Sequence, residues 1–371
     1  MLHSAVAAAS APRNASLDHL RVVLTALVIL HHTAIVYGGS GGWYWKQEPD
    51  ASQRLLLLFN AVNQSYFMGF FFLLAGYFTP GSFDRKGPAR YLGERFVRLG
   101  LPLLAYVLVL SPLTIALAHY ARGQPFMAAW GERYREHDVE PGPLWFAWAL
   151  LLFALAYVSW RRLTGIRPGK VSRLPSPVTL LLAAIVVGAA SFLVRLAVPV
   201  GHNVLWLQLG YFPPYILLFI LGCMAAPNQL LERITATDAR PWLITSAIML
   251  VLLPVVLVTA AGHGDVHGGW SFNAAFYALW DPLTAWGIIL GLLWSFRTYF
   301  PEGNRFTEAL ARQAFGAYIV HPPVVVALSL LARNLPMHPL LKFGLVGMAA
   351  CVGAFAVSSL LLLIPPLRKV L

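Results

Sequence analysis

The chain has 371 residues and a formal net charge of +12, and 58% of its residues are hydrophobic while only 11% are charged. Soluble domains carry about 25% charged residues, because their surfaces need polar groups. The composition therefore excludes an ordinary soluble enzyme, a disordered protein and a nucleic-acid-binding domain. It predicts an all-α integral membrane protein with many spans. Both cysteines lie in apolar runs, so no disulfide framework is predicted.

Ten apolar segments are long enough to form membrane spans, since a helical span needs about 20 mostly apolar residues. They are predicted at 17–38, 55–79, 96–118, 144–160, 178–198, 204–225, 241–261, 271–296, 309–333 and 339–364. The fourth is the shortest, so we expect it to be less tilted or partly interfacial. Because the connecting segments are short, 17–367 is predicted to form one transmembrane bundle. A segment at 1–16 precedes it and a short tail at 368–371 follows.

The positions of lysine and arginine predict the orientation, because cytoplasmic loops are enriched in these residues. With the N-terminus in the cytoplasm, most of the 27 lysines and arginines lie on the cytoplasmic side, including the clusters at 85–98 and 161–173. The first 16 residues lack the basic and apolar regions of a cleavable signal. The first span is therefore expected to stay as an anchor, and both termini are predicted to be cytoplasmic.

The predicted outer loops combine aromatic rings with acidic and histidine side chains. Such residues occur at 43–50, at 130–140 and at 263–270. Carbohydrate sites use aromatic faces with carboxylates, but an interfacial belt also explains tryptophans at these positions. We favour the belt for the aromatic residues taken alone. His263 and His267 have metal-like spacing, yet two histidines on a glycine-rich loop without a cysteine are a weak signal, so no metal site is predicted.

The first span carries ionisable residues where lipid-facing residues are expected to be apolar. Arg21 and His32 are 11 positions apart, which is almost three helical turns, so both face the same way about 16 Å apart along the axis. Asp18 falls near that face, while His31 points about 100° away. Ionisable groups inside spans are functional candidates. The alternative is an arginine anchored at the membrane end and a histidine bonded to a neighbouring helix.

Arginines also cluster in the loop after the second span and at the start of the third. Arg95 and Arg98 form an R-x-x-R pair, and Arg85 and Arg90 precede them. Two arginines at i and i+3 on a helix point the same way and suit phosphate oxygens. A purely topogenic cluster of positive charge is the alternative explanation.

Three more ionisable residues lie inside predicted spans: Arg195, Asp281 and His321. Opposite charges in neighbouring spans tend to pair, so an ion pair between Arg195 and Asp281 is expected; orientation of an imidazole by Asp281 is the other interpretation. Pro322 and Pro323 follow His321 and are expected to break the helix and free backbone carbonyls. This broken helix either lines a cavity or is only a kink.

Several segments together resemble the acyltransferase-3 family of membrane acyltransferases, with a looser likeness to its periplasmic-glucan succinyltransferase branch. The matching segments run along nearly the whole chain in the family's order: Leu17–Arg21 with His32, Phe70–Phe78, Arg95–Leu99, Leu144–Phe146, Phe219–Gly222 and Gly316–His321. The R-x10-H and R-x-x-R motifs are each short, but their combination with ten spans is specific. Ala75 departs from the family, which usually has serine there, so a serine nucleophile at that position is not expected.

The resemblance implies transfer of an acyl group, such as acetyl or succinyl, from cytoplasmic acyl-CoA to a hydroxyl of an extracytoplasmic carbohydrate or glycolipid, in a bacterial inner membrane. Acyl-CoA would be a cosubstrate, with no permanently bound cofactor. The resemblance carries over Arg21 and His32 as one functional pair, Arg95 and Arg98 as another, and His321 as part of a late motif. Joined to the residue-level argument, it predicts His32 as general base, Arg21 beside the donor arm and the basic loop as the phosphate site. His321 is a candidate oxyanion donor, and an amide of the proline-broken segment is the alternative. Asp281, Arg195 and Asp18 are possible supporting residues.

Two other classes of function stay open from the sequence. A transporter or flippase for a sugar or lipid-linked substrate also explains buried charges and a broken helix. It needs neither arginine motif, and no inverted repeat is evident. A haem-bearing oxidoreductase would use histidines as axial ligands, and a membrane protein without activity would leave the buried histidine and arginine unexplained. The oligomeric state is not predicted.

Overall fold

In a computed structural model of the chain, the described residues are 14–48, 53–135, 140–169, 171–259, 262 and 264–371. Ten helical segments among them are long and apolar enough to cross a membrane. This confirms the prediction of an all-α membrane protein with ten spans. The predicted N-terminal segment at 1–16 lies largely outside the described residues, and the cytoplasmic placement of the two termini stays a prediction.

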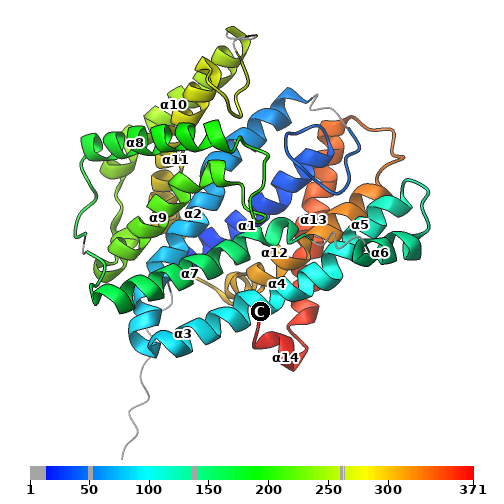
Figure 1. Cartoon of the computed structure of the whole chain (residues 1–371), viewed down its shortest axis with the longest axis horizontal. Coiled ribbons are helices and arrows are strands. Elements are labelled where there is room, and N and C mark those ends of the chain that lie inside the picture. The colour runs from blue at the N-terminus through cyan, green and yellow to red at the C-terminus, as the bar shows by residue number, and fades with distance from the viewer. Residues whose placement is uncertain (1–13, 49–52, 136–139, 170, 260–261, 263) are drawn as a thin grey trace, which may run out of the picture.

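Fourteen α-helices and several shorter helical turns make up the bundle within the described part of the chain (Figure 1). The helices are α1 (Ala15–Val36), α2 (Arg54–Lys86), α3 (Pro88–Arg95), α4 (Leu101–Ala105), α5 (Ser111–Tyr120), α6 (Phe126–Arg135), α7 (Trp145–Thr164), α8 (Pro177–Ala197), α9 (Phe212–Ala225), α10 (Ala236–Thr259), α11 (Phe272–Tyr299), α12 (Arg305–Leu331), α13 (Pro339–Leu361) and α14 (Pro365–Arg368). Turns of 3-10 helix lie at Gly142–Leu144, Leu209–Tyr211, Ala226–Asn228 and Leu230–Arg233.

Several predicted spans have different limits in the structure, and the second runs to Lys86 rather than ending at 79. The third begins at Pro88 rather than 96, and the fourth continues to Thr164 rather than ending at 160. In both cases the helix runs on through arginines, whose long apolar stems let the charge reach the membrane surface. The fourth span is therefore not short. Residues 204–208, which were expected to open the sixth span, form a turn before Leu209.

The third span contains two π-helical turns that were not predicted from the sequence. α3, α4 and α5 form one continuous helical path, joined by π-helical turns at Phe96–Gly100 and Tyr106–Leu110. A π-helical turn holds one residue more than an α-helical turn and is frequent at functional sites. Arg98 lies inside the first of these turns, so the expected α-helical geometry of the R-x-x-R pair does not apply to it.

α1 is the central helix of the bundle. It packs against α2, α11, α12 and α13 (Figure 1). Leu20, Leu24 and Ile29 on α1 are fully buried. This position keeps both ends of α1 in contact with several other spans, so residues from distant parts of the sequence gather around Arg21 and His32.

α2 and α9 approach so closely that no side chain fits between them at two glycines. A Cβ atom on Gly76 would lie 2.1 Å from the carbonyl oxygen of Phe219, and one on Gly222 would lie 2.2 Å from that of Leu73. Small residues allow such backbone contact between membrane helices. The two glycines belong to the Phe70–Phe78 and Phe219–Gly222 segments that carry the family resemblance, and their close packing gives those segments a structural reason.

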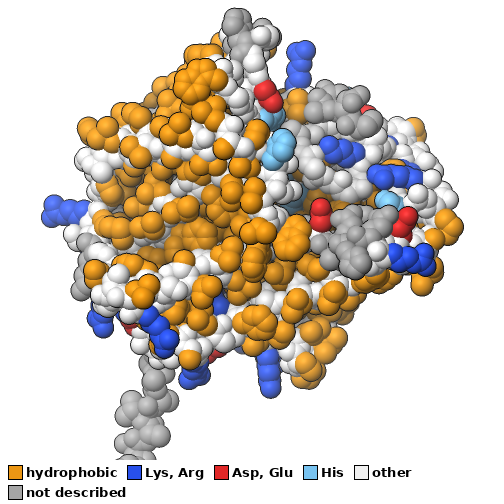
Figure 2. All heavy atoms as spheres, viewed as in Figure 1, with side chains coloured by type: hydrophobic (Ala, Val, Ile, Leu, Met, Phe, Trp, Pro, Cys, Tyr) orange, Lys and Arg blue, Asp and Glu red, His pale blue; other side chains and the backbone are white. Residues whose placement is uncertain are grey.

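Hydrophobic side chains cover most of the face shown in Figure 2. Exposed apolar side chains are frequent on α8, α10 and α13, with Val258 on α10 74% exposed and Val352 on α13 67% exposed. The same view shows histidines beside this apolar surface, where polar and charged side chains begin. Exposed apolar residues on long helices are what lipid contact requires.

Candidate active site

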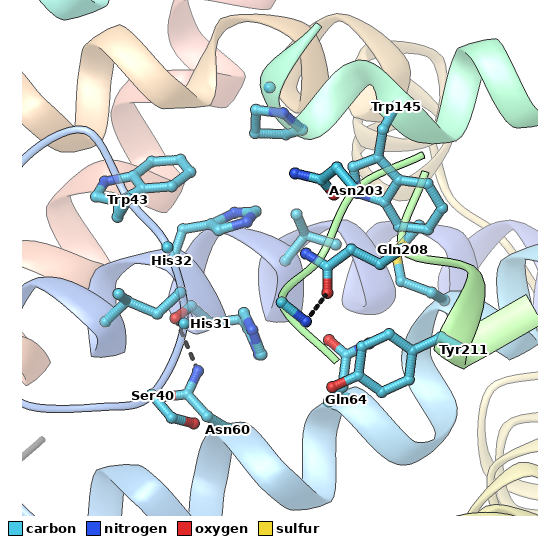
Figure 3. Close-up of a pocket in the computed structure, with 18 of the residues that line it drawn as sticks. His31, His32, Ser40, Trp43, Asn60, Gln64, Trp145, Asn203, Gln208 and Tyr211 are labelled. Atoms are coloured by element: carbon cyan, nitrogen blue, oxygen red, sulfur yellow. Dashed lines mark hydrogen bonds between the residues drawn. The ribbon is translucent and has the colours of Figure 1, made fainter. Parts of the chain in front are cut away.

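A cavity of about 710 Å³ lies at the end of the bundle where α1 ends and α2 begins. One wall carries His31, His32 and Trp43, and the opposite wall carries Trp145 and Gln208 (Figure 3). The arginine clusters lie at the other helix ends, because α1 begins near Arg21 and α2 ends at Lys86. By the predicted orientation, the cavity faces the outside of the cell.

The loop after α1 folds back over His32. Gly38 and Gly41 have φ values of +106° and +128°, which glycine adopts without steric cost. The backbone amide of Gln47 donates to the carbonyl of Val36 at 2.9 Å, and this hydrogen bond holds the far end of the loop against α1. The ring of Trp43 thereby stacks on His32, with 4.2 Å between centroids and 15° between planes.

The predicted residues His32 and His321 are in direct contact. Nε2 of His321 lies 2.9 Å from Nδ1 of His32, and Nδ1 of His321 lies 2.5 Å from the carbonyl oxygen of Tyr318. A carbonyl only accepts, so His321 must donate from Nδ1, and its Nε2 in the neutral ring carries a lone pair. His32 then donates from Nδ1, which leaves a lone pair on its own Nε2. A nitrogen with a free lone pair is what a general base requires.

His31 faces α2 instead. The side-chain amide of Asn60 donates to the carbonyl of His31 at 3.0 Å, and the amide of Asn63 lies 3.4 Å from its Nδ1. Its ring stacks on Phe67 at 5.0 Å. This separates the roles of the adjacent histidines, because His31 joins α1 to α2 and His32 joins α1 to α12.

The wall opposite His32 combines amides with aromatic rings. Asn203 and Gln208 come from the loop before α9, and Gln64 comes from α2 (Figure 3). The amide of Gln64 donates to the Tyr215 hydroxyl at 3.2 Å. Trp145 lies nearly parallel to Tyr215, with 6.1 Å between ring centroids. Amides that both donate and accept, beside flat rings, suit a ligand that carries several hydroxyl groups.

Arg195 and Asp281 form the predicted ion pair behind this wall. Their side chains meet at 2.5 Å, and both are almost fully buried. Nε of Arg195 also donates to the carbonyl of Gly210 at 3.0 Å. The pair therefore ties α8 and α11 to the loop that carries Gln208. Asp281 is therefore in contact with Arg195, while His267 of the cavity lies within electrostatic range of it.

Arg21 and the R-x-x-R pair converge at the opposite end of α1. Arg95 and Arg21 both lie within electrostatic range of Arg98. Asp18 forms an ion pair with Arg21, as their i, i+3 spacing allows. Arg95 also lies over the ring of Tyr91, 5.2 Å from its centroid. Three guanidinium groups are thus gathered at one mouth of the bundle.

The two preceding arginines are exposed, as Arg98 is. Arg85 is exposed in the last turn of α2. Arg90 is also exposed, and its Nε pairs with Glu94 at 3.1 Å. They widen the positive surface next to Arg95 and Arg98.

The loop before α11 borders the cavity through His267. Its backbone amide donates to the carboxylate of Asp265 at 3.0 Å, and this contact lowers the pKa of Asp265. The ring of His267 also lies 2.9 Å from the same carboxylate. His263, the other histidine with metal-like spacing, lies outside the described residues, as do Asp50 and 136–139 of the outer loops.

The cavity includes several residues that the sequence analysis did not select, among them Gln64, Asn203 and Gln208. Gln64 gave a usable signal, since an amide within an apolar span is costly unless it is bonded. Asn203 and Gln208 gave none, because Asn203 is a single polar residue of a predicted connecting segment and Gln208 fell within the span predicted at 204–225.

Comparisons with known proteins agree with this architecture. A family model described as an acyltransferase domain matches residues 14–363. Similar curated proteins include glucans biosynthesis protein C from Salmonella schwarzengrund, Salmonella heidelberg and Salmonella typhimurium, each 25% identical over 342 residues that cover 85% of this chain and 83% of the relative. No solved structure matches the chain. The family match spans nearly the whole of the ten-span bundle, so this chain is a membrane acyltransferase and belongs to the acyltransferase-3 family.

Proposed function

We propose that the protein transfers an acyl group from cytoplasmic acyl-CoA to a hydroxyl of an extracytoplasmic carbohydrate or glycolipid in a bacterial inner membrane. The observation that carries this proposal is the layout of α1. A single continuous helix, Ala15–Val36, holds Arg21 at the arginine-rich mouth and His32 in the cavity. The two side chains face the same way about 16 Å apart along the axis.

The arginine-rich mouth supports a polyphosphate donor. Arg21, Arg95 and Arg98 bring three positive charges together, Asp18 pairs with Arg21, and Glu94 lies within electrostatic range of Arg98. Guanidinium groups bind phosphate oxygens through paired N–H donors. Arg95 and Arg98 hold the phosphates of acyl-CoA, while Arg85 and Arg90 raise the local positive potential that attracts them.

The pantetheine arm of the donor follows α1 inward. The cavity already reaches Val28, one turn inward from His32. The remaining stretch runs from Arg21 past Thr25, which is buried. Neighbouring side chains must therefore move apart at Thr25 when the arm enters, and the thioester then arrives beside His32.

His32 acts as the general base at the thioester. Nε2 takes the proton of an acceptor hydroxyl, and the hydroxyl oxygen attacks the thioester carbonyl to form a tetrahedral intermediate. The carbon–sulfur bond then breaks, an ester remains on the acceptor, and the proton on Nε2 passes to the leaving thiolate to give free CoA. Both nitrogens of His321 are already engaged, with Tyr318 and with His32. His321 therefore supports His32 rather than donating to the oxyanion.

The amide and aromatic wall supports a carbohydrate acceptor. Gln64, Asn203 and Gln208 offer donors and acceptors across the cavity from His32, and Trp145 offers a flat face. The similar proteins are named for glucan biosynthesis, which agrees with an acceptor rich in hydroxyl groups. The acceptor hydroxyl reaches His32 from this wall.

The direct test is acyl transfer in proteoliposomes that contain the purified protein. Acetyl-CoA and succinyl-CoA labelled in the acyl group are supplied on one side, and glucose oligosaccharides on the other. We expect label to enter an oligosaccharide ester, with release of free CoA, from at least one donor. His32→Ala should abolish the transfer. Label transfer at the wild-type rate by that variant, or hydrolysis without any ester, would contradict the proposal.

A further inference from the structure

Pro322 leaves the carbonyl of Tyr318 without its usual helical partner. In an α-helix that carbonyl accepts the backbone N–H four residues on, which is position 322. Proline has no N–H. α12 nevertheless continues through Pro322 and Pro323 to Leu331, so the helix is not broken as the sequence predicted. A buried carbonyl without a donor is costly, and Nδ1 of His321 satisfies this one at 2.5 Å.

We propose that Pro322 fixes the direction of a hydrogen-bond chain from the Tyr318 carbonyl through His321 to His32, and that His321 is thereby a positioning residue. The free carbonyl holds the proton of His321 on Nδ1, which makes its Nε2 an acceptor. That acceptor holds the proton of His32 on Nδ1 and leaves the lone pair of His32 on Nε2. The effects on catalysis that follow from this inference rest on the proposed function, whereas the positions of the protons on the two rings do not.

Stacking keeps the rings of this chain from turning. His321 lies 5.0 Å from His32 with 18° between their planes, and Trp43 lies on the same stack, 5.9 Å from His321. His321 is fully buried. A flip of the His321 ring would place C–H groups where Nδ1 and Nε2 now meet their partners, and its other tautomer would turn the lone pair of Nδ1 towards the Tyr318 carbonyl oxygen. In this arrangement both nitrogens of His321 are paired, and the ring of His32 also interacts with the backbone of Val28.

The first test is solid-state NMR of the membrane-embedded protein labelled with ¹⁵N-histidine. Single histidine substitutions assign the signals. We expect both His321 and His32 to show a protonated Nδ1 and an unprotonated Nε2 at neutral pH. A protonated Nε2 on either ring would overturn the chain, whatever the protein catalyses.

The second test compares two amides at position 321. The side-chain oxygen of His321→Gln lies where Nε2 was and accepts from His32, whereas His321→Asn reaches only the Tyr318 carbonyl. We expect kcat to fall less than tenfold in His321→Gln and at least a hundredfold in His321→Asn, as for loss of a general base. KM for acyl-CoA should change less than twofold in both. Equal kcat values in the two variants, or a loss confined to KM, would overturn the positioning role.

The third test uses the neighbouring proline as a matched control. Pro322→Ala supplies the Tyr318 carbonyl with an amide, so the hold on the His321 proton weakens. Pro323→Ala supplies an amide to the carbonyl of Ile319, which is not a member of the chain. We expect kcat to fall about threefold to tenfold in Pro322→Ala, as for one ordinary hydrogen bond, and less than twofold in Pro323→Ala. Equal losses of kcat in the two variants would indicate that both prolines act only on the shape of α12.

These outcomes separate the two proposals. The expected ¹⁵N pattern without acyl transfer would uphold the chain and overturn the proposed function. Acyl transfer together with a different ¹⁵N pattern would uphold the function and overturn the chain. Circular dichroism and thermal unfolding of each variant show whether a loss of activity comes from misfolding.

Discussion

His32 and His321 are 289 positions apart in the sequence, and their ring nitrogens meet at 2.9 Å. The contact joins the central helix α1 to α12 behind the cavity wall that carries His32. It joins the buried His321 to His32 on the cavity wall, so that Nε2 of His321 accepts a hydrogen bond and Nε2 of His32 keeps a lone pair. The chemistry proposed for this protein depends on that pair.

Substitution of His32, the proposed general base, is the most direct test of this pair of histidines. We expect His32→Ala to lower kcat by about 10²–10⁴-fold, the usual worth of general base catalysis. Acyl-CoA binding should remain, because the arginines lie at the other end of α1. Single-turnover rates and CoA affinity, measured on the same preparation, separate the two effects. Loss of CoA affinity with an unchanged chemical rate would place His32 in the donor site instead.

Loss of Arg98 should act on donor binding. Saturation with CoA at about 100 times Kd stabilises a folded protein by roughly 2.7 kcal/mol, and Arg98→Ala should lose most of this stabilisation. Arg312→Ala is the matched control, because Arg312 is an exposed arginine that pairs loosely with Glu308 at 3.9 Å. Thermal unfolding in detergent with and without CoA measures both. Equal stabilisation of all three proteins would argue against a phosphate contact at Arg98.

Substitution in the amide wall should weaken acceptor use. Gln208→Ala removes hydrogen-bonding groups from the wall opposite His32, and we expect KM for the acceptor to rise about threefold to thirtyfold, as for one or two hydrogen bonds. KM for acyl-CoA should stay within twofold. Gln124→Ala, an exposed glutamine between α5 and α6, serves as the control. A rise in both KM values would indicate that Gln208 supports the fold rather than the acceptor.

The buried ion pair offers a prediction about stability. Asp281→Asn leaves Arg195 charged and without its partner, which costs about 3–5 kcal/mol in buried pairs. The double variant Asp281→Leu with Arg195→Met removes both charges and should recover most of that loss. Thermal unfolding in detergent gives the comparison. The double variant still lacks the bond to Gly210, so its acceptor KM should stay high even where its stability recovers.

The close contact of α2 and α9 should tolerate no side chain. Gly76→Ala places a Cβ atom 2.1 Å from the carbonyl oxygen of Phe219, so the helices must move apart. We expect a sharp fall in folded yield and thermal stability, because overpacking costs about 1–3 kcal/mol or more. Gly344→Ala on α13 meets nothing within 4 Å and should be neutral or slightly stabilising. Comparable losses in both variants would contradict this account of the contact.

The sequence was sufficient for the fold and for the residues on α1, but not for the contacts between distant helices. Helical periodicity placed Arg21 and His32 on one face, and charge neutrality led to the pair of Arg195 with Asp281. The contact of His321 with His32 depends on packing between helices far apart in sequence, which no local pattern encodes. Gln208 was missed because the apolar run around it resembles a span, while the chain turns there before Leu209.

The two π-helical turns in the third span make its length as important as its composition. Each holds one residue more than an α-helical turn, and about 100° of rotation follows every residue along the helix. The hydroxyl of Tyr106 meets that of Tyr44 at 2.8 Å only in the present register. Deletion of Gly100, which follows both arginines, would turn Tyr106 away from Tyr44, a residue that lines the cavity. This span therefore accepts many substitutions but few changes in residue number.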